Sequence, residues 1–216
     1  SDWSSDVCSS DLAMLPERMA HAVNKDLQRR EDAFQDFVKN QPLVDRLFER
    51  ALADQESEQV NGFPFYVFCY DHGLIKAWNT NKIVAVSADT LPVATSIVRN
   101  DRGVFIAKPV YPFPQDSSKQ MVVLFPVLTT YPLENNYLKS HFVASEYIPV
   151  NTKIIAPDKD ATGAYPIILH GEQKLFFLQF NPLDVQKWIP DPMFIIMLML
   201  ALIASMSWIQ LMIIYL

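Results

Sequence analysis

The sequence predicts an α+β protein with a long N-terminal helix, then a mostly antiparallel sheet, then one transmembrane helix. Three observations predict this order. Apolar residues recur at three- and four-residue spacing through residues 14–56, which is the period of an amphipathic helix. Beyond residue 62, short apolar runs are separated by turn residues, which is typical of strands. From Met193 to Leu216 no side chain is charged, and this run reaches the length of about 20 apolar residues that a bilayer-spanning helix needs.

Composition narrows the class of protein. The chain has 216 residues, of which 50% are hydrophobic and 19% are charged, enough for one ordinary domain and one or two further helices. The net charge of −6 argues against a nucleic-acid-binding protein, which would carry a basic patch. Two cysteines cannot make a disulfide framework or a four-cysteine zinc site, and no glycine-rich phosphate loop occurs. Composition therefore favours a membrane-attached domain.

Residues 2–12, DWSSDVCSSDL, resemble the translation of a widely used sequencing adapter in one reading frame. A natural Ser/Asp-rich linker is the alternative, since linkers have this composition. We expect residues 1–12 to be non-native and exclude them from the fold. Cys8 is then not a native residue, and Cys69 has no partner within the chain for a disulfide.

Residues 13–59 are predicted as an amphipathic helical segment close to the membrane. Pro42 interrupts the helix, and Asn40 before it is suited to cap a second helical segment. The segment either packs on its own domain or pairs with its copy in a homodimer. The face opposite the apolar stripe is expected to carry the charged residues Glu17, Arg18, Lys25, Arg29, Arg30, Asp32 and Asp36.

Residues 60–187 are predicted as an α+β sensor domain with about six or seven strands. A first hairpin joins Phe65–Tyr70 to Leu74–Trp78 through Asp71-His72-Gly73, which has turn chemistry. Leu133–Phe142 is expected to form a short inserted helix. The other expected strands are Gly103–Lys108, Met121–Leu128, Lys153–Ala156 and a second hairpin of Ile167–Leu169 with Lys174–Phe180. The expected core comprises Phe65, Val67, Phe68, Val123, Phe125, Phe176 and Leu178. A helix followed by such a sheet is typical of PAS-like or Cache-like sensor domains.

Residues 191–216 are predicted as a transmembrane helix. Pro190 and Pro192 suit a helix start, and Trp188 lies where an interfacial aromatic residue is expected. The alternative, a helix buried in a soluble protein, would need more protein around it than this chain provides. Lys187 is the only basic residue close before the span, so residues 13–190 are expected outside the cytoplasm.

The residues with reactive side chains do not form a catalytic pattern. The four histidines lack the spacing of metal ligands, and no GxSxG motif occurs. Cys69 lies in the apolar run FYVFCY, which indicates a buried structural thiol. The sequence therefore predicts no enzyme activity, metal or cofactor for this chain and favours a binding module.

Two clusters of aromatic and polar residues are candidates for a ligand site, because aromatic rings with amides and a carboxylate suit a small polar ligand. The alternative is that the same side chains hold a structural corner by bonding to backbone groups. The first cluster contains Trp78, Asn79 and Asn81. The second contains Tyr131, Glu134, Asn135 and Tyr137.

These residues also carry a resemblance to the N-terminal sensory region of bacterial membrane-bound histidine kinases, over roughly residues 17–216. A D-x-L-x-x-W-x-x-N pattern falls, one residue out of its usual spacing, on Asp71, Leu74, Trp78 and Asn81. A more specific Y-P-x-E-N-x-Y-L-x-x-x-F signature falls without a gap on Tyr131, Pro132, Glu134, Asn135, Tyr137, Leu138 and Phe142.

The resemblance implies a two-component sensor in the bacterial inner membrane, with a first membrane helix upstream. It also implies a homodimer, an external small-molecule or protein signal, and a cytoplasmic kinase region beyond Leu216 that uses ATP and Mg²⁺. That kinase would phosphorylate a cognate response regulator. Two other outputs stay open, since a fold does not fix its output. The same input module can serve a diguanylate cyclase or chemoreceptor, or the chain can be a membrane-anchored periplasmic binding or enzyme module.

Overall fold

The computed structural model describes residues 16–83, 92–135, 137–159, 161–169, 174–181, 196–205 and 208. Residues 15–185 make one compact unit, and helical residues 196–205 belong to a second. The elements of the first unit are α1 (Pro16–Lys39), α2 (Gln41–Glu49), α3 (Asp54–Asn61), β1 (Tyr66–Asp71), β2 (Leu74–Trp78), β3 (Ser96–Asn100), β4 (Gly103–Val110), β5 (Lys119–Thr129), β6 (His141–Phe142), β7 (Lys153–Ile155), β8 (Tyr165–Ile168) and β9 (Lys174–Gln179). This is an α+β fold, as the sequence predicts.

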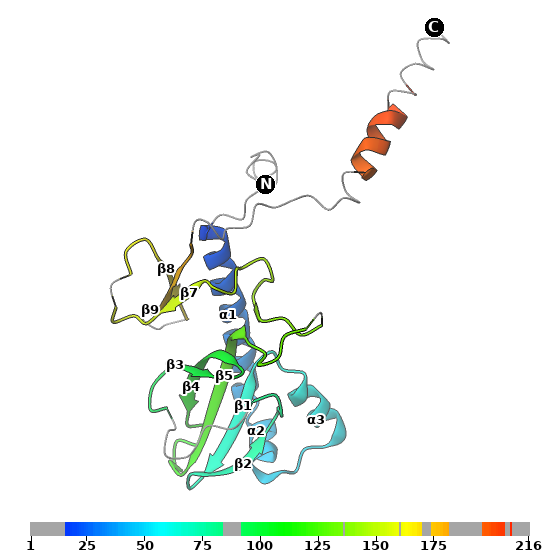
Figure 1. Ribbon diagram of the computed structural model, residues 1–216. Helices are drawn as coiled ribbons and strands as arrows, with labels where there is room; N and C mark the ends of the chain where they lie inside the picture. The colour runs from blue at the N-terminus through cyan, green and yellow to red at the C-terminus, as the bar shows by residue number, and fades with distance from the viewer. Residues whose placement is uncertain are drawn as a thin grey trace, which may run out of the picture. The chain divides into compact units, whose positions relative to one another are not determined.

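Helix α1 packs on its own domain and extends along both sheets (Figure 1). Its apolar stripe is buried, and the rings of Phe34, Phe65 and Phe125 meet edge to face. The expectation that Arg30 lies on the charged outer face is wrong. Arg30 and its neighbour Glu31 are only 7% and 2% exposed, because spacings of three and four from Leu27 place both on the buried side.

Two further helices follow α1. Asn40 caps α2 as predicted, because its side-chain oxygen accepts a hydrogen bond from the Leu43 amide. Helix α3, which the sequence analysis did not separate from the preceding helix, begins after residue 53. Glu56 holds it in place by accepting hydrogen bonds from the Ala53 amide and from the Arg46 guanidinium.

The larger sheet has the order β2-β1-β5-β4-β3, with the short strand β6 beside β5. Every strand pair in the described part of the chain is antiparallel. The predicted hairpin turn is confirmed, since His72 and Gly73 both have positive φ, as a two-residue hairpin of this type requires. Phe68 and Leu124 belong to a cluster on one face, and the alternation of strands turns Phe65 and Phe125 to the α1 face. All seven predicted core residues are buried.

The smaller sheet has the order β7-β9-β8 and lies against the first half of α1 (Figure 1). Asn24 of α1 extends its edge, because the Asn24 side chain donates to the Pro166 carbonyl at 3.2 Å and accepts from the Ile168 amide at 2.9 Å. The predicted strands of this hairpin are present, whereas the expected turn residues 170–173 lie outside the described residues.

The short helix expected over Leu133–Phe142 is absent from the described residues of that segment, which form a loop ending in β6. The Asn135 side chain accepts hydrogen bonds from the amides of Tyr137 and Leu138, both at 2.8 Å. This local bonding competes with a helical hydrogen-bond ladder and stabilises the turn instead.

The described helical residues of the C-terminal segment, 196–205 and 208, lie within the predicted span of 191–216. No helix within the described ranges is long and apolar enough to cross a membrane. The predicted residues 191–195, 206–207 and 209–216 lie outside those ranges.

Candidate functional site

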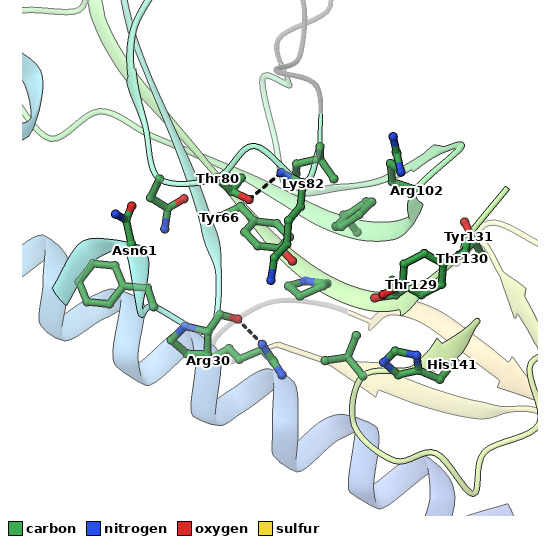
Figure 2. Close-up of a pocket in the computed structure, with 17 residues that line it drawn as sticks. Arg30, Asn61, Tyr66, Thr80, Lys82, Arg102, Thr129, Thr130, Tyr131 and His141 are labelled. Carbon is green, nitrogen blue, oxygen red and sulfur yellow. Dashed lines mark hydrogen bonds between the residues drawn. The ribbon is translucent and has the colours of Figure 1, made fainter. Parts of the chain in front are cut away.

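A cavity of about 560 Å³ opens between α1 and one end of the larger sheet (Figure 2). Its walls come from segments that are distant in sequence: α1, the start of β1, the loop after β2, the β3–β4 turn, the end of β5 and β6. The polar and charged lining residues are Arg30, Asn61, Tyr66, Asn79, Thr80, Lys82, Arg102, Thr129, Thr130, Tyr131 and His141. Ligand pockets commonly have volumes of about 300–1,000 Å³, so this cavity can hold a small organic molecule.

The charged residues that line this cavity are all basic. Arg30, Lys82 and Arg102 are cations, whereas none of the 17 described lining residues is Asp or Glu. The apolar lining includes Ile83. A partly enclosed cavity with positive charge and an apolar wall attracts a negatively charged organic molecule.

Arg30 lies on the α1 side of the cavity and is held by two partners. Its Nε donates to Asp26 Oδ2 at 2.6 Å, one helical turn earlier, and its Nη1 donates to the Pro64 carbonyl. Asp26 is shared, because Arg29 Nη2 also lies 2.6 Å from its Oδ1. Arg30 is therefore held in place. The single carboxylate of Asp26 pairs with two guanidinium groups, those of Arg29 and Arg30.

Tyr66, on β1, turns its ring into the cavity (Figure 2). Burial raises the pKa of the Tyr66 hydroxyl, Tyr131 raises it further, and the positive charge of Arg30 lowers it. Within the described part of the chain no residue hydrogen-bonds to the Tyr66 hydroxyl, which can therefore donate to a ligand.

Lys82 and Arg102 lie on the solvent side of the cavity. The Lys82 amide donates to Thr80 Oγ1 at 3.1 Å, and the Lys82 side chain extends into the cavity toward the side on which Arg30 lies (Figure 2). Arg102 is at the rim, with its Nε 3.8 Å from Asp101 Oδ2. No carboxylate of the described residues forms an ion pair with the Lys82 ammonium.

His141 is on the far wall from Lys82 (Figure 2). Its Nδ1 lies 2.9 Å from the Lys139 carbonyl, so the hydrogen-bond network assigns a proton to Nδ1. That leaves Nε2 as an acceptor in the neutral ring and as a donor in the protonated ring.

The first predicted cluster divides between two places. Asn79 lines the cavity but is structural, because its side chain accepts from the Val67 amide at 2.8 Å and donates to the carbonyls of Val60 and Phe65. Trp78 and Asn81 bond to each other at 3.1 Å and line a different, smaller hollow.

The second predicted cluster is also divided. Tyr131 lines the cavity, whereas Glu134 and Asn135 line a separate hollow of about 420 Å³ and Tyr137 is 94% exposed. Glu134 Oε1 accepts from the Ser140 amide at 3.0 Å, and the hydrogen bonds with Ser140 lower the pKa of the Glu134 carboxyl. Glu134 and Asn135 thus bond to backbone groups of their own loop.

Sequence reasoning missed most of the cavity lining, and with it the charged residues Arg30, Lys82 and Arg102 and the ring of Tyr66. Arg30 could have been found, because a charged residue three positions from Leu27 lies within an apolar helical stripe. Tyr66 was predicted only as part of a strand. Lys82 and Arg102 are exposed loop cations, and no sequence pattern distinguishes them from other surface charges.

The remaining chemical expectations concern Cys69 and metals. Cys69 is fully buried in β1, and burial raises the pKa of its thiol, as expected for a structural thiol. Among the described residues no group of His, Cys, Asp or Glu is placed to bind a metal ion. Comparisons with protein-family models, with curated proteins and with solved structures each found no match.

Proposed function

We propose that this chain is the signal-input region of a membrane-bound bacterial sensor, and that the cationic cavity binds the signal. The observation that carries the proposal is a cavity of small-molecule size whose lining includes polar groups without protein partners in the described chain. The sheet order β2-β1-β5-β4-β3, with one long helix along a face, supports the PAS-like or Cache-like interpretation.

Helix α1 supports a signalling role because it contacts the cavity and both sheets. Arg30 reaches the cavity, and six residues earlier Asn24 bonds to the edge of β8. A ligand that changes the surroundings of Arg30 therefore acts on an element that also holds the smaller sheet. Allosteric coupling requires such an element with contacts to both regions.

The charge-free residues 193–216 support attachment to the bacterial inner membrane, with residues 13–190 outside the cytoplasm. The output is proposed to be a histidine kinase region that follows Leu216, forms a homodimer, uses ATP and Mg²⁺ and phosphorylates a response regulator. The kinase signature on Tyr131–Phe142 is the reason for choosing this output.

The test joins the chain at Leu216 to the catalytic core of a histidine kinase and restores a membrane helix upstream. Autophosphorylation is measured in membrane vesicles whose periplasmic side is exposed to a small-molecule cell extract. We expect the extract to change the rate, and we expect Thr129→Trp, which fills the cavity, to remove the response. Val150→Trp, in the separate hollow, is the matched control. A response that survives Thr129→Trp, or no response in the wild type, contradicts the proposal.

A further inference from the structure

The described carboxylates neutralise only part of the positive charge of the cavity. Asp26 is shared between Arg29 and Arg30, and the Lys82 ammonium forms no ion pair with any described residue. Arg30 is only 7% exposed and depends on this shared carboxylate, whereas Lys82 is exposed and has no described carboxylate beside it. This arrangement leaves room for an anion.

Two side chains around this space have hydrogen-bond donors that the described residues do not use. The Arg30 guanidinium has five N–H groups, and its described partners, the Asp26 carboxylate and the Pro64 carbonyl, occupy three of them. Tyr66 lines the same cavity, and its hydroxyl has no described partner. Figure 2 shows Lys82 and Tyr66 extending into the same space above Arg30.

We propose that the cavity binds a small organic oxyanion, a carboxylate or a phosphate monoester, held by Lys82, Arg30 and the Tyr66 hydroxyl. The apolar body of the molecule contacts Phe105 and Ile83. Charge-assisted hydrogen bonds from ammonium and guanidinium groups are stronger than neutral ones and give such a site its selectivity for oxyanions. This inference rests on the proposed function, because it names the chemical class of the signal.

The experiment uses the full chain in detergent micelles and calorimetric titration with matched pairs of probes. The pairs are benzoate with benzamide, succinate with succinamide, and glucose 6-phosphate with glucose, so that carboxylate and phosphate are tested separately. We expect at least one anion to bind about tenfold or more tightly than its uncharged counterpart. Lys82→Met keeps the aliphatic stem and should weaken that anion about tenfold, and Tyr66→Phe should also weaken it.

Lys153→Met is the control, because Lys153 is an exposed lysine on the smaller sheet. Equal binding of anions and uncharged counterparts overturns the inference, as does wild-type affinity in Lys82→Met. If an uncharged probe binds and Thr129→Trp abolishes its binding, the cavity remains a ligand site and only the anion inference fails. If no probe binds to the wild type, the inference is overturned together with the ligand site.

Discussion

Two hollows of this protein differ in the charge of their lining and in how their polar atoms are used. In the hollow of about 420 Å³, Glu134 accepts from the Ser140 amide and Asn135 accepts from two further amides. In the cavity of about 560 Å³, Lys82 and the Tyr66 hydroxyl have no described protein partner. The difference teaches that Glu134 and Asn135, which already bond to backbone amides, are weaker candidates for ligand contacts than the Tyr66 hydroxyl.

The largest expected effect concerns the core between α1 and the larger sheet, on which the cavity is built. Phe125 lies in β5, is fully buried and meets the rings of Phe34 and Phe65. Phe125→Ala should lower the free energy of unfolding by about 3–5 kcal/mol, because it removes buried surface and leaves a void. Urea unfolding of the full chain in micelles measures this, with Phe125→Leu as a milder control. A loss below about 1 kcal/mol would mean that β5 does not support the fold as described.

A second prediction tests whether Asn79, which lines the cavity, has a structural role. Asn79→Ala leaves the Val67 amide and the carbonyls of Val60 and Phe65 without their side-chain partner, so we expect a loss of about 3 kcal/mol. Asn81→Ala, at an exposed position, should change stability by less than about 0.5 kcal/mol. Equal effects of the two substitutions in urea unfolding would contradict the structural role of Asn79.

The smallest expected effect is a pH-dependent change in stability at Glu134, in the hollow of about 420 Å³. Hydrogen bonds with Ser140 lower the pKa of Glu134 in the folded protein, so ionised Glu134 stabilises the fold at neutral pH. Its contribution is present above the ordinary glutamate pKa of about 4.3 and is lost as the pH falls through the lowered value. Glu134→Gln should therefore be slightly less stable than wild type at pH 7, and the difference should vanish in acid. A difference in melting temperature that grows in acid would contradict this role.

Much of the fold could be predicted because the strands carry strong local signals. The run of β5 is apolar on both faces, since one face meets α1 and the other contributes Leu124 to the cluster that contains Phe68. The β1–β2 turn follows from Asp71-His72-Gly73. Strand β3 was missed because only Ile97 and Val98 are apolar in an edge strand that is half exposed. The helix expected over Leu133–Phe142 was wrong because Asn135 bonds to the following amides instead.

The site was less predictable than the fold. Asn79 and Tyr131 line the cavity, whereas the other five predicted site residues lie elsewhere. The residue types of those five match a ligand site, but the fold places them outside the cavity. Arg30, Lys82 and Arg102 come together only because α1, the β2 end and the β3–β4 turn meet at one end of the sheet. No local pattern in the sequence predicts that these three segments lie together.

The central claim is that the cavity, and not the hollow beside Glu134, binds the signal. Methyl NMR of the full chain in micelles tests it most directly, with signals assigned for Ile83 in the cavity wall and Val150 in the second hollow. During titration with fractions of a small-molecule cell extract, the account predicts that an active fraction shifts the Ile83 methyl signals and leaves those of Val150 unchanged. Shifts at Val150 with Ile83 unmoved would contradict the claim and make the hollow beside Glu134 the sensory site.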